Sequence, residues 1–387
     1  MERKQIFSLI AKQLSLFPTV ALLGARQVGK TTLARAIAAQ AQGAGKMVHL
    51  FDLEDPSHAA RLHDPMLALQ ALDGLVIIDE IQTSPELFPT LRVLNDRSDS
   101  TTRFLILGSA SPELLKQGSE TLAGRIAFIE ISPFGLYENP DILVSLLWER
   151  GGYPRSFLAE STEDSLSWRR EYLKTFLERD IPQLGFSVPS LGMRRFWTML
   201  AHYHGQNINY SELGRSLDIS DATVRRYLDI LAGAYVVRRV QPWFENIKKR
   251  QLKSPKVYIR DSGIFHSLMS ISDLASLQNH PKLGASWEGF ALEEVAKALR
   301  LREEETYYWA VHGQGELDLL LFRNGRRVGV EFKFSSSPTI TKSMNLAIEM
   351  LQLDTLEIVH PGQGSWRLSE KITCYGLREI ISKWENE

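Results

Sequence analysis

The chain has 387 residues, of which 44% are hydrophobic and 24% charged, a balance typical of folded globular proteins with two or three domains. Its net charge of −1 excludes a uniformly basic polyanion-binding protein, so any nucleic-acid surface must be local. The single cysteine, Cys374, excludes an intramolecular disulfide and a cysteine-rich metal site. No apolar run is long enough to cross a bilayer and no signal-peptide pattern is found, so we expect a cytoplasmic protein without a membrane partner.

Residues 24–31 read Gly-Ala-Arg-Gln-Val-Gly-Lys-Thr and match G-x-x-x-x-G-K-[ST]. An apolar run of strand composition, 19–23, precedes the motif, and a run of good helix formers, 32–39, follows it. Strand, glycine loop and helix together predict a phosphate-binding loop that holds ATP at a helix N-terminus. The residues expected to bind the nucleotide are Gly24, Ala25, Arg26, Gln27, Val28, Gly29, Lys30, Thr31 and Thr32. Lys30 would reach the β- and γ-phosphates, and the Thr31 hydroxyl would hold Mg²⁺.

A second acidic motif follows the apolar run 75–78, which is typical of a strand buried on both faces of a parallel sheet. The run ends in Asp79-Glu80, and ligands of open α/β sheets bind at the carboxyl ends of strands. We expect Asp79 to hold Mg²⁺ and Glu80 to act as the base that orients the attacking water.

Apolar runs at 46–51, 103–107 and 127–131 bring the predicted strands to five, in alternation with helices. We expect the strand at 103–107 to lie between the strand before the glycine loop (19–23) and the strand before Asp79-Glu80 (75–78), as in ATPases that use a catalytic glutamate. Ser109 then lies where such enzymes place a polar residue that senses the γ-phosphate. Arg125 is interpreted either as a catalytic arginine finger or nucleotide sensor, or as a solvated arginine before an edge strand.

The middle of the chain is predicted to be mostly helical, with helices at 141–150 and 168–180 around the turn Gly-Gly-Tyr-Pro at 151–154. A helix-turn-helix follows, with its second helix at 221–231. Its apolar residues Val224, Leu228 and Leu231 form a buried stripe. The residues expected to face outward, toward DNA, are Thr223, Arg225 and Arg226.

Two further strands, 235–240 and 253–259, would form the wing of a winged helix. Positive charge concentrates around them at Lys248, Lys249, Arg250, Lys253 and Lys256. Two interpretations stay open: the module contacts DNA, or it is an ATPase lid or protein-docking module whose basic residues are merely solvated.

The C-terminal region begins with a predicted amphipathic helix, 286–299, and continues with strands at 306–310, 315–322 and 327–333. A hairpin turn at 323–326 would place Asp318 across from Glu331 and Lys333. Two carboxylates and a lysine at one sheet edge can hold Mg²⁺ and stabilise charge on a phosphodiester, with Glu288 as a further acid. The alternatives are a surface strand of alternating charge and a nuclease fold that does not cut.

These motifs together resemble one family, the bacterial and archaeal AAA-type ATPases with a C-terminal domain of unknown function similar to restriction-endonuclease-like nucleases. The segments that carry the resemblance are 24–32, 75–80, 107–111, 122–125, 151–154, 178–180, 255–261 and 315–333. The resemblance implies association with DNA, and it implies that Gly152-Tyr153-Pro154 is similar to the Gly-x-Pro element by which signal-transduction ATPases sense nucleotide. Ser109 departs from the asparagine that many such enzymes carry.

The sequence thus predicts an α/β protein of three domains: a P-loop AAA-type ATPase with a parallel sheet (1–135), a helical and winged-helix region (136–270) and a restriction-endonuclease-like domain (271–387). We expect a Mg²⁺-dependent ATPase whose nucleotide state controls a DNA-associated C-terminal half. The alternatives are an ATP-gated nuclease and a switch that docks a protein partner without cleavage. An arginine finger from a neighbouring subunit would require an oligomer, whereas action within one chain would not.

Overall fold

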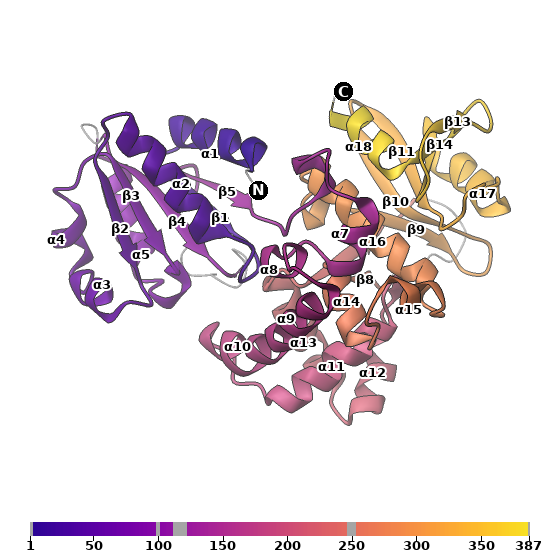
Figure 1. Ribbon diagram of the computed structural model, residues 1–387, viewed down its shortest axis with the longest axis horizontal. Helices are drawn as coiled ribbons and strands as arrows, with labels where there is room; N and C mark the ends of the chain where they lie inside the picture. Colours follow the sequence, from indigo (N-terminus) through magenta and orange to yellow (C-terminus); the bar gives the residue numbers. More distant parts are fainter. Residues whose placement is uncertain (1–2, 98–100, 111–121, 246–252, 386–387) are drawn as a thin grey trace. The chain divides into compact units, whose positions relative to one another are not determined.

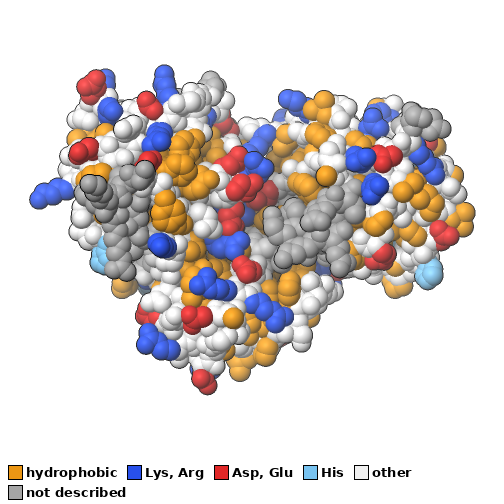
Figure 2. Space-filling view, turned by 180° about the vertical axis from the view of Figure 1, so that it is seen from behind, with side chains coloured by type: hydrophobic (Ala, Val, Ile, Leu, Met, Phe, Trp, Pro, Cys, Tyr) orange, Lys and Arg blue, Asp and Glu red, His pale blue; other side chains and the backbone are white. Residues whose placement is uncertain are grey.

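The computed structural model describes residues 3–97, 101–110, 122–245 and 253–385. Its packing divides the chain into two compact units, and each is described by itself (Figure 1). Unit 1 comprises residues 1–133, 175–188 and 233–235, and unit 2 comprises 134–174, 189–232 and 236–387. On the face drawn in Figure 2, Lys and Arg side chains are interspersed with Asp and Glu side chains, in keeping with a net charge of −1.

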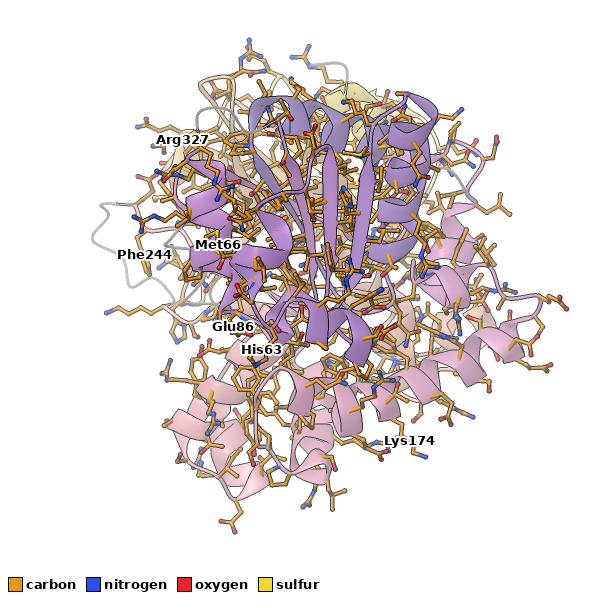
Figure 3. All side chains as sticks on the ribbon, turned by 90° about the vertical axis from the view of Figure 1, so that its left-hand side faces the viewer. His63, Met66, Glu86, Lys174, Phe244 and Arg327 are labelled. Carbon is orange, nitrogen blue, oxygen red and sulfur yellow. The ribbon has the colours of Figure 1, made fainter. Side chains whose placement is uncertain are left out.

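Unit 1 is built on a parallel sheet, which has five strands in its described part (Figure 3). The strands are β1 (Thr19–Leu23), β2 (Val48–Asp52), β3 (Leu75–Asp79), β4 (Arg103–Gly108) and β5 (Ile126–Glu130). They lie in the order β2-β3-β4-β1-β5, so β4 separates β1 from β3 as the sequence predicts. The α/β fold class and the parallel core expected of a P-loop ATPase are confirmed.

Helices cover this sheet, which explains why its central strands β1 and β3 are buried along almost their whole length and mostly apolar. They are α1 (Lys4–Leu16), α2 (Lys30–Gly43), α3 (Pro56–Arg61), α4 (Pro65–Leu69), η1 (Ile81–Thr83) and α5 (Leu87–Asn95). One buried cluster joins β1, β3 and β4 to α5, through Ala21, Val76, Phe104 and Leu91. The packing holds the carboxyl ends of β1 and β3 side by side across β4, which positions the loops that follow them.

The predicted helix at 168–180 differs from the structure, where it is divided between two helical forms. Helix α9 (Thr162–Thr175) ends at Thr175, and a π-helical turn, η4 (Phe176–Asp180), and the short α10 (Ile181–Gln183) follow. Phe176, Leu177 and Ile181 are buried, and the segment 175–188 packs with unit 1 although its chain neighbours belong to unit 2. Such π-turns often mark functional positions in helices.

The helical part of unit 2 contains the expected pair of helices, α12 (Tyr210–Leu217) and α13 (Asp221–Gly233). Asp218 ends α12 in the left-handed conformation (φ +56°). A side chain at Gly214 would come within 2.7 Å of the Ile219 carbonyl oxygen, so the tight turn requires glycine there. The other helices of this part are η3 (Leu136–Glu138), α7 (Val144–Arg150), α8 (Pro154–Phe157), α11 (Ser190–His202), α14 (Ser262–Leu268) and α15 (Leu274–Gln278).

The rest of unit 2 is organised by a second sheet, which has nine strands among the described residues, in the order β13-β14-β12-β11-β10-β9-β7-β8-β6. The strands are β6 (Gln206–Asn207), β7 (Val237–Pro242), β8 (Lys256–Ile259), β9 (Tyr307–Val311), β10 (Gly315–Arg323), β11 (Arg326–Phe332), β12 (Thr355–His360), β13 (Ser365–Arg367) and β14 (Ile372–Gly376). The antiparallel pair β7–β8 lies where the wing was expected. Because β7 also pairs with β9, strands from both sides of residue 270 form one continuous sheet.

The hairpin β10–β11 has the register predicted from its turn, in which Asn324 and Gly325 both have positive φ values. Leu319 pairs with Val330, so Asp318 lies directly opposite Glu331. Helices α16 (Leu283–Leu299), η5 (Glu303–Glu305), α17 (Lys342–Leu351) and α18 (Leu377–Glu385) complete this part. None of the described helices combines the length and apolarity that a membrane span requires.

Candidate functional site

The glycine loop between β1 and α2 has a backbone that depends on its two motif glycines. Gly29 caps α2 in the left-handed region (φ +95°), and Gly24 has φ +155°. A Cβ atom on Gly24 would lie 2.2 Å from the carbonyl oxygen of Ile131, which leaves no room for a side chain. Ala25 and Val28 are buried, whereas Gln27 and Thr32 are exposed. The loop therefore presents its backbone N–H groups at the N-terminus of α2, as anion binding requires.

The Lys30 ammonium group lies inside this loop. Its Nζ donates to the carbonyl oxygens of Gly24 and Ala25, each at 2.9 Å, and to Ser109 Oγ at 3.2 Å. Burial lowers the pKa of Lys30 to about 8, against the opposing effects of the Glu80 and Asp79 carboxylates. Phosphate oxygens arriving here would add negative charge and favour the charged ammonium.

Thr31 and Asp79 come from the two sequence motifs and meet at the edge of the sheet. The Thr31 hydroxyl donates to Asp79 Oδ2 at 2.7 Å, and burial raises the pKa of Asp79. A hydroxyl and a carboxylate are hard oxygen donors, which suit Mg²⁺ shared with nucleotide phosphates. These two residues therefore fit the expected magnesium ion.

Glu80 stands beside these groups, with its backbone in the left-handed region (φ +57°). Its carboxylate accepts hydrogen bonds from Gln82 Nε2 and, at 3.4 Å, from Ser109 Oγ. Gln82 also accepts from the Ser109 backbone N–H at 3.2 Å. The structure thus brings Ser109 to both Lys30 and Glu80, and it adds Gln82, which the sequence motifs did not single out.

The Arg26 side chain extends from the glycine loop into a group of acids. Its guanidinium donates to Asp180 Oδ1 and to Gln183 Oε1, each at 2.5 Å, and also to Glu54. Glu80 Oε1 is 3.6 Å away. Asp180 and Glu54 lie far from the motifs in sequence, and the sequence did not predict either of them at this site. The only signal for Asp180 was that it lies in segment 178–180, one of the segments that carry the family resemblance.

Arg125 lies at the amino ends of the strands, opposite the ends that carry the glycine loop. The Thr19 N–H donates to the Arg125 carbonyl oxygen at the amino end of β1, about 13 Å of strand away from the glycine loop. The guanidinium pairs with Asp96 at 2.5 Å in an exposed position. The side chain therefore lies at the end of the strands away from the glycine loop, as a solvated arginine before an edge strand would, and its role as an arginine finger or nucleotide sensor stays a prediction.

The predicted DNA-facing residues of α13 have different surroundings. Ser220 caps α13 by accepting the Thr223 backbone N–H at 3.1 Å, and the Thr223 hydroxyl lies 2.9 Å from Ser220 Oγ. The Arg225 guanidinium stacks on the Tyr210 ring at 3.8 Å, and Arg226 is exposed. Val224, Leu228 and Leu231 are buried as predicted.

The acidic residues of the C-terminal region meet as the hairpin register predicts. The Asp318 backbone N–H lies 3.4 Å from Glu331 Oε2, and Lys333 Nζ lies 2.7 Å from Glu331 Oε1. Glu288 on α16 belongs to the same group. Burial, followed by the nearby Asp318 carboxylate, raises the pKa of both Glu288 and Glu331.

The centre of this acidic group is occupied by Lys256 of strand β8. Lys256 is 1% exposed, and its Nζ lies 3.2 Å from Asp318 Oδ1, 3.5 Å from Glu288 Oε1, and in contact with Glu316. Although burial lowers its pKa, the surrounding groups raise it well above the ordinary value.

The expectation that Lys256 adds to a basic wing surface is wrong, because its side chain is buried among these carboxylates. Lys253 is exposed, and Lys248, Lys249 and Arg250 lie outside the described residues. Across the described ranges, no cluster of three or more acidic, histidine or cysteine side chains is arranged to hold a metal ion.

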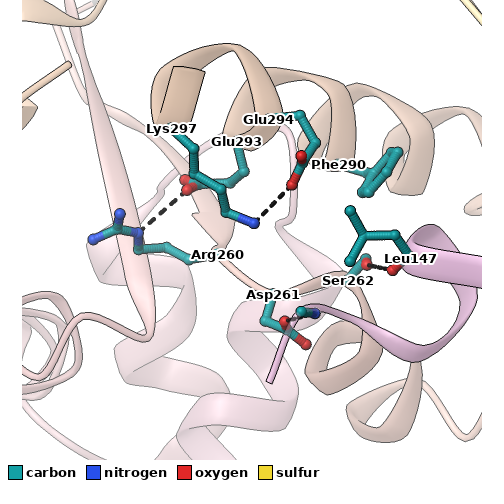
Figure 4. Close-up of a pocket in the computed structure, with 9 residues that line it drawn as sticks. Leu147, Arg260, Asp261, Ser262, Phe290, Glu293, Glu294 and Lys297 are labelled. Carbon is teal, nitrogen blue, oxygen red and sulfur yellow. Dashed lines mark hydrogen bonds and ion pairs between the residues drawn. The ribbon is translucent and has the colours of Figure 1, made fainter. Parts of the chain in front are cut away.

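The Gly-Gly-Tyr-Pro turn adjoins a small charged cavity in unit 2 (Figure 4). The Gly152 N–H donates to Asp261 Oδ2 at 2.7 Å, and the cavity is walled by the ion pairs Arg260–Glu293 and Lys297–Glu294. Its volume of about 10 Å³ holds about one water molecule. The cavity is therefore part of a buried network of charged side chains and is too small to hold a nucleotide.

Comparison with known proteins places these features in a family. Residues 17–139 match the model of an AAA domain, and 143–275 and 283–380 match two domains of unknown function, DUF8612 and DUF4143. The uncharacterized protein Rv2008c of Mycobacterium tuberculosis is 48% identical over 382 residues, which cover 99% of this chain and 85% of the relative. This chain belongs to the same family. The uncharacterized protein Mb2031c of Mycobacterium bovis matches to the same extent.

Solved structures similar to the chain include a Walker-type ATPase, PABY2304 of Pyrococcus abyssi. It is 15% identical, with a TM-score of 0.43, covering 69% of this chain and 95% of that one. AMPPCP-bound DnaA from Aquifex aeolicus is 15% identical, with a TM-score of 0.30, covering 59% of this chain and 87% of that one. The AAA domain and the parallel sheet together identify the N-terminal part of the chain as a P-loop ATPase of the AAA type.

Proposed function

We propose that the chain binds ATP together with Mg²⁺ and hydrolyses it at the glycine loop of unit 1. The observation that carries the proposal is that the glycine-loop motif, with Lys30 and Thr31, meets the acidic motif, with Asp79 and Glu80. The two motifs lie about 50 residues apart in sequence, and the 2.7 Å hydrogen bond from Thr31 to Asp79 joins them. Phosphoryl transfer depends almost entirely on positioning and charge, and these four groups supply both.

Each side chain has a defined task in the proposed reaction. The backbone N–H groups at the start of α2 and the Lys30 ammonium bind the β- and γ-phosphates, and Lys30 is held ready by the Gly24 and Ala25 carbonyls. Thr31 and Asp79 would hold Mg²⁺, which when bound neutralises phosphate charge. Glu80 orients the attacking water and accepts its proton. Ser109, bonded to both Lys30 and Glu80, links phosphate binding to the base.

The test is steady-state ATP turnover in Lys30→Ala and Glu80→Gln, with nucleotide binding measured separately. We expect Lys30→Ala to lose binding and turnover, and Glu80→Gln to bind ATP but turn it over at least 100-fold more slowly. Lys46→Ala, which removes an exposed lysine of the same unit, is the control. Unchanged turnover in Lys30→Ala would contradict the proposed site.

We further propose that nucleotide state controls a DNA-associated unit 2, with α12 and α13 acting as a winged helix. The exposed Arg226 and the chain connections of segment 175–188 to unit 2 on both sides support this. Arg226→Ala should weaken binding to duplex DNA and reduce the salt dependence by about one phosphate contact, whereas Arg35→Ala, on an exposed part of α2, should not. Equal affinity in the two variants would contradict the DNA assignment.

An ATP-gated nuclease is a second candidate, because Asp318, Glu331 and Lys333 have the register of a nuclease site. Lys256 in the middle of these acids favours instead a nuclease-like fold used for docking, since its ammonium occupies the space between the carboxylates. Incubation of single-stranded, duplex and branched DNA with Mg²⁺ or Mn²⁺, with and without ATP, separates the candidates. Cutting that is lost in Asp318→Ala would establish the nuclease, and absence of cutting favours a switch that docks DNA or a protein partner.

A further inference from the structure

The third residue of the glycine loop, Arg26, is held by carboxylates. Its side chain is 13% exposed, and its guanidinium pairs with Asp180 at 2.5 Å and with Glu54, while Glu80 lies 3.6 Å away. Arg179 approaches the same Glu54 at 3.5 Å. All these residues belong to unit 1. Arg26 therefore lies between the proposed catalytic base and an acid from a distant part of the chain.

Asp180 differs from the other acids because of the segment that carries it. It ends the π-helical turn η4 and is 5% exposed, and burial raises its pKa despite the hydrogen bond from Arg26. Gln183, one turn later, accepts from the same guanidinium nitrogen at 2.5 Å. The flanking residues 134–174 and 189–232 belong to unit 2. Arg26 of the glycine loop thus makes two polar contacts with segment 175–188, whose flanking residues on both sides belong to unit 2.

A guanidinium group binds carboxylates and phosphates with the same planar, two-pronged geometry. Arg26 directly follows Gly24 and Ala25, whose carbonyl oxygens accept hydrogen bonds from the Lys30 ammonium. That ammonium is the group proposed to bind the γ-phosphate. The Arg26 guanidinium also faces Glu80, which is proposed to orient the attacking water. A γ-phosphate bound by Lys30 would bring negative charge to the site that Arg26 and Glu80 share, and ADP would not bring that charge.

We propose that Asp180 and the γ-phosphate of ATP compete for Arg26, so that Asp180 sets the preference of the site for ATP over ADP. This inference rests on the proposed ATP site and adds a specificity-determining residue to it. When ATP is bound, Arg26 turns to the γ-phosphate and releases Asp180 and its segment. When only ADP is bound, Arg26 returns to Asp180 and fastens the segment 175–188 again.

Competition makes a different prediction from general charge repulsion. Removing any nearby negative charge eases the binding of every nucleotide, because ATP and ADP are both anionic. Removing a competitor for Arg26 helps only the nucleotide that uses Arg26. The ratio of the two affinities, and not either affinity alone, therefore distinguishes competition from simple electrostatics.

The experiment measures the dissociation constants of the full chain for ADP and for a non-hydrolysable ATP analogue, both with Mg²⁺. Asp180→Asn keeps the shape of the side chain and removes its charge, and Glu178→Gln, on the exposed side of the same turn, is the matched control. We expect Asp180→Asn to bind the analogue about tenfold more tightly, with ADP affinity changed less than twofold. Glu178→Gln should bind both nucleotides as the native chain does.

Arg26→Gln provides the second arm. It should weaken binding of the analogue and not of ADP, and adding Asp180→Asn in that background should change neither affinity. Equal tightening of both nucleotides in Asp180→Asn, or tightening that persists without Arg26, would overturn the competition. Amide hydrogen exchange supplies a readout independent of affinity: the analogue, and not ADP, should speed exchange in residues 175–188, and equal exchange with both would also overturn it.

Failure of the inference can be told apart from failure of the proposed ATP site. If the native chain binds nucleotide and Lys30→Ala does not, the site stands, and an unchanged affinity ratio in Asp180→Asn refutes the competition alone. If the native chain and Lys30→Ala bind nucleotide equally, or neither binds it, both proposals fall.

Discussion

Replacing Lys256 by methionine should destabilise unit 2 substantially, because the change removes a buried ammonium group that contacts both Glu288 and Asp318. Methionine keeps most of the length of the side chain, so the loss is one of charge rather than of packing. The Lys256 Nζ lies 3.2 Å from Asp318 and 3.5 Å from Glu288, whose side chains are 8% and 19% exposed. Removing one partner of a buried ion pair typically costs about 3–5 kcal/mol.

The lower end of that range applies here. Glu316, the third carboxylate, is 47% exposed and can turn into water when the lysine is gone. Asp318 and Glu288 are more buried, and Glu288, whose pKa is raised to about 7 by burial and by Asp318, would relieve their repulsion by taking up a proton. We therefore expect a loss of about 3 kcal/mol, which lowers the melting temperature of a unit of this size by about 6–12 °C. Calorimetry of thermal unfolding measures this loss.

A divalent cation should restore the stability of this variant. With the ammonium gone, the two carboxylates are free to take Mn²⁺, and a ligand at a hundred times its dissociation constant stabilises by about 2.7 kcal/mol. The native chain should gain much less, because Lys256 already fills the space. Lys333→Met is the matched control: Lys333 pairs with Glu331 but is 38% exposed, so its loss should cost no more than about 1 kcal/mol. Native-like stability in Lys256→Met, or equal stabilisation of the native chain by Mn²⁺, would refute this reasoning.

Three further predictions concern other charged groups. Burial lowers the pKa of His204 and His266 to about 3, so each histidine is neutral in the folded chain. Below the ordinary histidine pKa near 6.5, each takes up a proton on unfolding, so the free energy of unfolding should fall as the pH drops through that value. We expect a loss of about 2 kcal/mol per histidine at pH 5, measured by urea unfolding. Glu293→Gln should cost about 3 kcal/mol in the same assay because it leaves the buried Arg238 without its anion, and a loss below 1 kcal/mol would contradict this. Arg125→Ala should leave ATP affinity unchanged within twofold in a binding titration, since Arg125 pairs with Asp96 at the far edge of the sheet, and a larger change would contradict that placement.

Elements whose residues are close in sequence were predicted well. The five strands of unit 1 were expected within about two residues of their bounds, and the Asn324-Gly325 turn fixed the register that sets Asp318 against Glu331. These features depend on short-range patterns: apolar runs, glycine positions and the two-residue period of strands. The meeting of Thr31 with Asp79 followed from the same patterns, because parallel strands end at one edge.

The contacts that the sequence did not predict have a common physical origin. Lys256 was expected on a basic surface, but it pairs with an acid 62 residues away, and Asp180 contacts a loop 154 residues earlier. The helix at 168–180 was expected to be continuous because its apolar spacing does not distinguish an α-turn from the π-turn at Phe176–Asp180. A lysine or aspartate has the same local pattern whether it is solvated or buried against a distant partner, so only the tertiary structure can separate the two.

The same long-range pairs hold distant segments of the chain together within each unit. Both proposed sites contain a cation held by acids from a distant part of the chain: Arg26 by Asp180, and Lys256 by Asp318. A buried ion pair of this kind adds little net stability, because desolvation offsets most of its attraction, yet breaking it on one side is costly. A ligand that offers a replacement charge removes that cost, so phosphate at Arg26 or a metal ion at Asp318 can exchange one set of contacts for another. Charged pairs joining distant segments are therefore the places where ligand binding at these sites would change the structure.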